Sequence, residues 1–207
     1  MAFKNYIFDI DGTLLNTYSV AYKAKEKVLK EYNLPFDKKM FDLGFASTSE
    51  KSLELLGVDL NTPLGQEILK KESIYYNEFS KDIEMFDGAL EVIKYLKDNQ
   101  ASLAIVTARN KDEVYTELKL AELLPYFDYV ITVSDVVNPK PDKESLEVLF
   151  KLSNWEKDES IFIGDSINDS KCAKSFGIKF GLAGWGAVEE VEHDYYFESL
   201  KDLKKLT

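Results

Sequence analysis

The sequence lacks the features of disulfide-linked, membrane-spanning and nucleic-acid-binding proteins. Its 207 residues include one cysteine, Cys172, which cannot form an intrachain disulfide, and one arginine, Arg109. With 37 acidic against 26 basic residues the net charge is −11, which argues against a general nucleic-acid binder. No apolar run approaches the roughly 18 residues of a membrane span, and the apolar segment near the N-terminus is too short for a signal peptide. We expect a cytoplasmic protein with no nucleic-acid or membrane partner.

Apolar residues are abundant, and they recur in a pattern. They make up 45% of the chain, enough for a core in one domain or two small ones. Runs of strand length lie at 6–8, 103–106, 129–133, 161–163 and, more weakly, 178–182. Segments with helical periodicity lie between them, at 89–97, 111–120, 143–152 and 169–176. Near-continuous apolar strands alternating with helices predict an α/β fold, with a parallel sheet covered on both faces.

This alternation is interrupted once, between residues 16 and 82, where no convincing strand occurs. Residues that cap helices precede three segments there: Asn16 or Thr17, Thr48 or Ser49, and Thr62 followed by a proline at the first helical position. The sequence therefore predicts a helical domain at 16–82, inserted into an α/β core domain made of 1–15 and 83–207.

Acidic residues cluster directly after two of the apolar runs. Asp9 and Asp11 follow the first run, and Asp165 and Asp169 follow the fourth. Taken alone, the first pair equally fits a strand-to-loop turn with solvated acids. In a parallel sheet, however, both clusters lie at the same edge, where open α/β folds bind ligands. Two unit charges about 4 Å apart repel by roughly 4 kcal/mol at an effective dielectric of 20, so the cluster needs a cation, and an all-oxygen site suits Mg²⁺.

Three further polar residues are candidates for binding an anion at this edge. Thr107 ends the second apolar run, and Lys140 lies between two prolines that stiffen its loop. Arg109 carries a planar fork suited to a carboxylate or a second phosphate. The alternative for Arg109 is an ion pair with Asp112 or Glu113 at the start of a helix.

Four motifs in order resemble those of the haloacid dehalogenase superfamily of phosphohydrolases. They are DIDGT at 9–13, Thr107 closing the segment IVT, Lys140 before a proline, and GDSIND at 164–169. The insertion after the first motif resembles the small α-helical cap of the phosphoglycolate phosphatase-like branch. Asn16 stands where that family usually has an acid. The resemblance covers nearly the whole chain and implies a Rossmann-like core with an inserted helical cap.

The resemblance also implies how the first motif would react. Asp9 is the implied nucleophile, which attacks phosphorus to give an aspartyl-phosphate. Asp11 is the implied general acid, and afterwards the general base that activates water. Relatives that displace halide from carbon lack an acid at the position of Asp11. Its presence therefore favours phosphate-ester chemistry over dehalogenation.

The remaining motif residues have implied roles in binding. The implied Mg²⁺ ligands are Asp9, the backbone carbonyl of Asp11, and Asp165. Asp169 is implied to act through a bound water or by contacting one of these ligands. The residues implied to bind phosphoryl oxygens are Thr107 and Lys140, with Arg109 as a further candidate.

The sequence thus predicts a Mg²⁺-dependent phosphatase that hydrolyses a small-molecule phosphate monoester, with phosphoglycolate as the first candidate substrate. Pyrophosphate, nucleotide monophosphates and sugar phosphates remain open. The alternatives are a phosphomutase of the β-phosphoglucomutase type and a catalytically silent binding protein, against which the complete motif set argues. The expected partner is a small phosphorylated metabolite, and both a monomer and a homodimer fit the sequence.

Overall fold

The structure is a computed structural model that describes residues 3–45 and 47–206. The chain divides into two compact units. The core unit comprises the chain up to Leu15 and from Met85 onward, and the helical unit runs from Asn16 to Glu84. Two short strands, β2 (Leu15–Asn16) and β3 (Glu84–Met85), pair with each other where the chain leaves the core unit and returns to it.

A six-stranded sheet forms the centre of the core unit. Its order is β5-β4-β1-β6-β7-β8, and every neighbouring pair is parallel. Its strands are β1 (Asn5–Phe8), β4 (Ser102–Val106), β5 (Tyr129–Ile131), β6 (Ser160–Gly164), β7 (Lys179–Ala183) and β8 (Tyr195–Phe197). The predicted α/β fold with a Rossmann-like parallel sheet and a helical insertion is confirmed.

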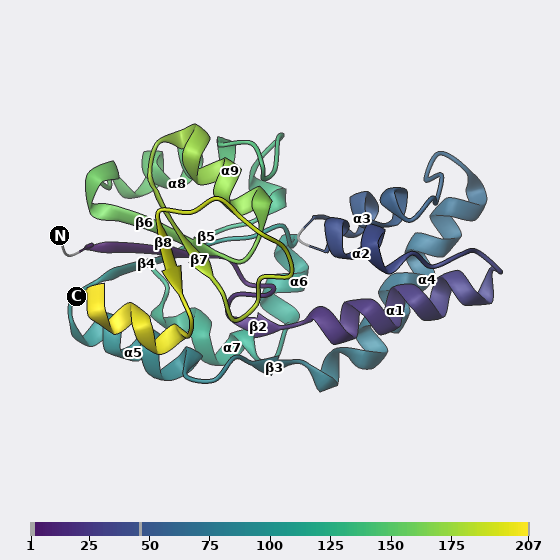
Figure 1. Cartoon of the computed structure of the whole chain (residues 1–207), viewed down its shortest axis with the longest axis horizontal. Helices are drawn as coiled ribbons and strands as arrows, with labels where there is room; N and C mark the ends of the chain where they lie inside the picture. The colour runs from purple at the N-terminus through teal and green to yellow at the C-terminus, as the bar shows by residue number, and fades with distance from the viewer. Residues whose placement is uncertain (1–2, 46, 207) are drawn as a thin grey trace. The chain divides into compact units, whose positions relative to one another are not determined.

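Helices cover both faces of this sheet, which explains why its inner strands are apolar on both sides. In Figure 1, α8 (Glu144–Ser153) and α9 (Ile167–Phe176) lie above the sheet, and α5 (Ala89–Asp98) lies below it. Leu149 of α8 and Cys172 of α9 belong to one buried cluster with side chains of the strands. The smaller elements are α6 (Lys111–Thr116), α7 (Leu120–Leu123), η2 (Leu124–Tyr126), η3 (Val133–Asp135), η4 (Lys157–Glu159) and η5 (Leu200–Leu206).

In the helices and the six-stranded sheet of the core unit, three differences from the predicted elements stand out. The helix expected at 111–120 is broken into α6 and α7, because Glu117 adopts an extended backbone after α6. The strand expected at 129–133 ends at Ile131, and the chain then forms η3. Strand β8 was not predicted, since it is a short edge strand whose middle residue, Tyr196, is exposed.

The helical unit contains four α-helices and one short 3₁₀ turn among its described residues. They are α1 (Tyr18–Glu31), α2 (Lys38–Gly44), α3 (Ser49–Leu55), α4 (Pro63–Phe79) and η1 (Ser80–Asp82). Thr48 and Thr62 cap α3 and α4 as predicted, since their hydroxyl oxygens accept backbone N–H groups of Lys51 and Gly65. Helix α2, capped by Asp37, was not predicted. No helix within 3–45 and 47–206 is long and apolar enough to cross a bilayer.

The helical unit has its own buried core. Phe41, Val28 and Ile68 belong to one apolar cluster, which joins α1, α2 and α4. Among these side chains lies a buried ion pair, in which Lys25 Nζ is 2.7 Å from Glu72 Oε1. Both partners are satisfied, so this pair fixes how α1 packs on α4.

Candidate active site

The carboxyl ends of β1, β4 and β6 bring the predicted site residues to one edge of the sheet. Asp9 follows β1, and its backbone N–H donates to the carbonyl of Ile163 in β6 at 3.0 Å. Thr107 follows β4 and Asp165 follows β6. Because β1 lies between the other two parallel strands, these three residues meet at the edge where such sheets bind ligands. The hydroxyl oxygen of Thr107 accepts the backbone N–H of Arg109 at 3.2 Å.

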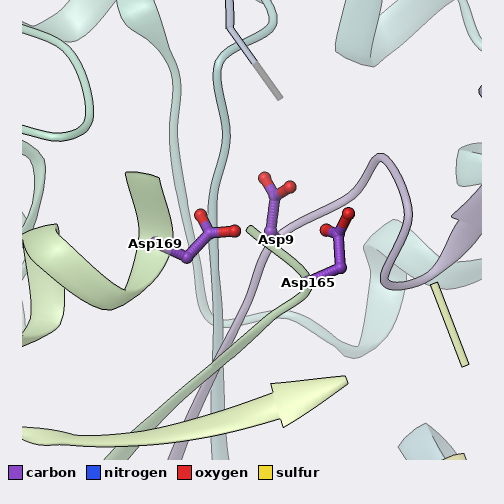
Figure 2. A group of neighbouring side chains, drawn as sticks. All are labelled: Asp9, Asp165 and Asp169. Carbon is purple, nitrogen blue, oxygen red and sulfur yellow. The ribbon is translucent and has the colours of Figure 1, made fainter. Parts of the chain in front are cut away.

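Three carboxylates converge at this edge. Figure 2 shows Asp9, Asp165 and Asp169 with their carboxylates side by side. One oxygen of each lies within 4.8 Å of the others, and all three residues are buried. Carboxylate oxygens are the ligands that hard divalent cations prefer. The donor set therefore fits a metal ion, and the triad is the candidate metal site of the described residues.

Lys140 lies against the same carboxylates. Its Nζ is 2.8 Å from Asp9 Oδ1 and 2.6 Å from Asp169 Oδ1, and it also donates to the carbonyl of Val106 at 3.2 Å. The side chain is only 2% exposed, so these charges interact with little screening by water. One cation faces three carboxylates here, which leaves an excess of negative charge.

Burial and charge both shift proton affinities at this site. Burial raises the pKa of Asp9 to about 7, with Asp169 and Asp11 adding to the shift and Lys140 opposing it. Burial and the neighbouring Asp169 raise the pKa of Asp165 well above its ordinary value. Burial alone would lower the pKa of Lys140, but Asp169 and Asp9 outweigh it and raise that pKa. A bound cation or bound protons are needed to relieve the excess negative charge.

Asp169 is fixed by the start of helix α9. Its Oδ2 accepts the backbone N–H of Ser166 at 3.2 Å and the hydroxyl of Ser166 at 2.5 Å. In return, the hydroxyl oxygen of Ser166 accepts the backbone N–H of Asp169, which completes a capping box. Since Oδ1 pairs with Lys140, both oxygens of Asp169 already have partners.

Two glycines of the acidic motifs leave room for the carboxylates. Gly12 has a φ of +76°, and a Cβ there would lie 2.1 Å from Asp165 Oδ2. Gly164, the first residue of the GDSIND motif, ends β6, and a Cβ there would lie 2.6 Å from the Cγ of Asp169. The hydroxyl of Thr13 donates to Asp165 Oδ1 at 3.1 Å. The carboxylates of Asp165 and Asp169 thus pack directly against the backbone of these two glycines.

A second loop supports the turn after Asp11. The indole N–H of Trp185, which follows β7, donates to the carbonyl of Thr13 at 2.9 Å. A Cβ on the neighbouring Gly186 would lie 1.7 Å from the carbonyl oxygen of Gly12. Only glycine therefore allows the loop after β7 to approach the turn this closely.

Arg109 has different partners from those expected of a helix-start arginine. Its Nε donates to Asp11 Oδ2 at 2.9 Å and one terminal nitrogen donates to Asp11 Oδ1 at 2.8 Å. Its other terminal nitrogen lies 3.8 Å from Glu117 Oε2. Among the described residues, Arg109 forms ion pairs with Asp11 and Glu117. Asp11 and Arg109 thus form a two-pronged ion pair beside the carboxylate triad.

Comparisons with known proteins agree with this geometry. A family model for haloacid dehalogenase-like hydrolases matches residues 6–183. Pyrophosphatase PpaX of Listeria innocua is 30% identical over an alignment of 211 positions, which covers 95% of this chain and 93% of the relative. A Haemophilus somnus structure, of a predicted phosphoglycolate phosphatase, superposes with a TM-score of 0.88 at 21% identity, over 99% of this chain and 97% of the other. The structure of YfnB of Bacillus subtilis, solved bound to magnesium, superposes with a TM-score of 0.77 at 20% identity, over 100% of this chain and 99% of the other.

The chain therefore belongs to the haloacid dehalogenase-like hydrolases. Within that class it is a phosphohydrolase, an enzyme of the phosphatase type. The structural likenesses, at identities below 25%, concern the fold.

Proposed function

We propose that the protein hydrolyses a small-molecule phosphate monoester with the help of Mg²⁺, through an aspartyl-phosphate on Asp9. The observation that carries this proposal is the convergence of Asp9, Asp165 and Asp169 within 4.8 Å, with Lys140 paired to two of them. An excess of buried negative charge has little structural value, because it opposes folding. It is useful where a cation and a phosphoryl group must be held together.

The residues that would hold magnesium are the carboxylates of Asp9 and Asp165 and the backbone carbonyl of Asp11. Asp169 would act through a bound water or by contacting one of these ligands. This role is supported by its two carboxylate oxygens, which already accept hydrogen bonds from Lys140 and Ser166. A bound magnesium ion supplies positive charge next to the phosphoryl oxygens. The magnesium-bound structure of the similarly folded YfnB supports this choice of ion.

The reaction then runs in two displacements on this chain's own groups. A carboxylate oxygen of Asp9 attacks phosphorus in line, the bond from phosphorus to the leaving oxygen breaks, and Asp11 gives its proton to that oxygen. Water next attacks the phosphorus of the aspartyl-phosphate and gives a proton to Asp11, which restores Asp9 and releases phosphate. Thr107 and Lys140 bind the phosphoryl oxygens, and Lys140 also keeps Asp9 oriented.

Two substrates have support from the comparisons. Phosphoglycolate is the first candidate, in line with the phosphatase named for the Haemophilus somnus structure. Pyrophosphate is the second, because PpaX of Listeria innocua is a pyrophosphatase and 30% identical. Both are small anions that carry a second negative group beyond the phosphoryl group to be transferred.

Phosphate release from a panel of small phosphate esters and pyrophosphate, with Mg²⁺ and with EDTA, tests the proposal. We expect release from one or a few compounds, lost in EDTA and restored by added Mg²⁺. Release that persists in EDTA would contradict the magnesium assignment. If no compound releases phosphate but glucose 1-phosphate is isomerised in the presence of a bisphosphate, the enzyme is a mutase and hydrolysis is wrong.

A further inference from the structure

Arg109 binds the carboxylate of Asp11, the residue proposed above as the general acid. Its side chain is 8% exposed, and it is the single arginine of the chain. The two nitrogens that face Asp11 donate one hydrogen bond to each oxygen of that carboxylate, at 2.9 and 2.8 Å. In the proposed reaction Asp11 must instead offer a proton to the leaving oxygen. The contact seen here therefore has to open during each turnover.

The backbone of Arg109 is held by hydrogen bonds at the base of this side chain. Its N–H donates to the hydroxyl oxygen of Thr107, and its carbonyl accepts the backbone N–H of Val133 at 3.1 Å. The next residue, Asn110, caps helix α6 in a capping box. The side chain therefore starts from a fixed position. Its planar guanidinium can bind a carboxylate or a phosphate with two parallel hydrogen bonds.

We propose that Arg109 binds a second anionic group of the substrate, a carboxylate or phosphate attached to the leaving oxygen, and that Asp11 occupies its fork when that anion is absent. This inference rests on the proposed function and narrows its substrate class. When the substrate's anion takes the fork, the carboxylate of Asp11 is released, takes up a proton from water, and turns toward the leaving oxygen as an acid. Compounds whose leaving group is neutral lack the anion that opens the contact, so the enzyme selects against them.

The geometry supports this exchange in two ways. The carboxylate of Asp11 already fills the fork, which shows that the space in front of Arg109 accommodates such an anion. Asp11 lies in the turn that follows β1, two residues from Asp9, so an anion in its place would adjoin the leaving oxygen of a phosphoryl group at Asp9. Glu117, 3.8 Å from the other terminal nitrogen, keeps the guanidinium oriented while its partner changes.

A binding experiment tests the inference without turnover. The probes are phosphonoacetate, which carries a carboxylate beside its phosphonate, and ethylphosphonate, which does not. Calorimetry with Mg²⁺ compares wild type, Arg109→Met, Arg109→Lys and the control Lys111→Met, which removes one exposed positive charge nearby. We expect wild type and Lys111→Met to prefer phosphonoacetate by about 100-fold, the scale of a lost charged partner. Arg109→Met should lose this preference, and Arg109→Lys should recover part of it.

Two results would overturn the inference. One is a wild-type protein that binds both phosphonates equally. The other is an Arg109→Met variant that weakens both to the same extent, since a purely structural arginine would affect both probes alike. Circular dichroism melts of each variant confirm that the fold is kept.

Kinetics separate this inference from the proposed function. The ratio of kcat/KM for pyrophosphate or phosphoglycolate to that for phenyl phosphate should fall about 100-fold in Arg109→Met. Magnesium-dependent release from phenyl phosphate by the wild type with no such preference would support the phosphatase and reject the role of Arg109. If the wild type hydrolyses no compound, the proposed function fails, and the phosphonate comparison alone decides the role of Arg109.

Discussion

Asp9 is the residue on which the proposed chemistry depends most. Its carboxylate is buried, touches Lys140, and shares the metal-site candidate with Asp165 and Asp169. An amide of the same shape keeps the packing but is a far weaker nucleophile toward phosphorus. The consequences of exchanging one for the other are therefore chemical rather than structural.

Asp9→Asn should reduce phosphate release by about 10⁴-fold or more, the scale seen when a nucleophile is removed. The melting temperature without metal should stay level or rise, because one of three crowded negative charges is lost. The matched control is Asp158→Asn, an exposed residue that should leave the rate unchanged. Unchanged turnover in Asp9→Asn would show that the nucleophile is another residue.

Asp11→Asn should slow hydrolysis of alkyl phosphates by about 10²–10⁴-fold, the usual contribution of a general acid. Calorimetry should find Mg²⁺ still bound, since only the backbone carbonyl of Asp11 is required there. Phenyl phosphate, with a leaving group that needs less protonation, should be affected less. Complete loss of the metal in this variant would contradict the assignment of Asp11 as an acid.

At the scale of elements, a glycine in the turn between β1 and β2 leaves the space that the carboxylates of the site occupy. Gly12 has a left-handed backbone, and a methyl group there would collide with the carboxylate of Asp165. Gly186 approaches the same turn from the loop after β7. Gly12 and Gly186, which have no Cβ, thus allow the loop after β7 and the carboxylate of Asp165 to lie close to this turn.

Gly12→Ala should lose most Mg²⁺-dependent activity, because it adds backbone strain and also displaces Asp165. The control is Gly57→Ala in the helical unit, which has a similar φ of +90° but open space around it. Both variants should lose about 1 kcal/mol of stability from the strained backbone. Activity assays should separate them: equal losses of activity in the two would show that the collision at Gly12 is unimportant.

The sequence predicts those elements whose signal is local. Strands β1, β4 and β6 are near-continuous apolar runs, and the acids that follow them had to meet at one edge of a parallel sheet. Strand β8 is short and partly exposed, so its pairing with β7 depends on the packed sheet rather than on its own residues. Helix α2 follows the capping residue Asp37, but its seven residues carry too little periodicity to stand out.

The candidate site was predictable in its charges but not in its contacts. The residue types and order indicated the acids and Lys140, since each follows an apolar run. The pairing of Arg109 with Asp11 joins residues on two different loops, and a sequence favours near neighbours such as Asp112 for an arginine. The close approach of Gly186 to the turn likewise exists only in the folded chain.

For the whole molecule, the buried carboxylates link stability to pH and metal. The pKa of Asp9 is raised to about 7, against roughly 3.9 in an unfolded chain, so the folded protein holds a proton that the unfolded chain has lost. Its contribution to the free energy of unfolding is full below about pH 4 and is lost as pH rises through 7. Asp165, whose pKa is also raised, contributes with the same sign.

Mg²⁺ should therefore raise the melting temperature more at pH 8 than at pH 5.5, because it binds the ionised carboxylates and competes with their protons. Thermal melts with Mg²⁺ and with EDTA at both pH values measure this difference. Asp9→Asn should show a smaller difference between the two pH values. A larger effect of Mg²⁺ at pH 5.5 would contradict the arrangement of charges described for the site.

Trapping the covalent intermediate tests the central claim most directly. Enzyme turning over its best substrate with Mg²⁺ is quenched with borohydride, which reduces an aspartyl-phosphate to homoserine, and the peptides are read by mass spectrometry. The account predicts homoserine at position 9 only when both substrate and Mg²⁺ are present. An unmodified Asp9, or homoserine at another aspartate, in a sample that is releasing phosphate would contradict it.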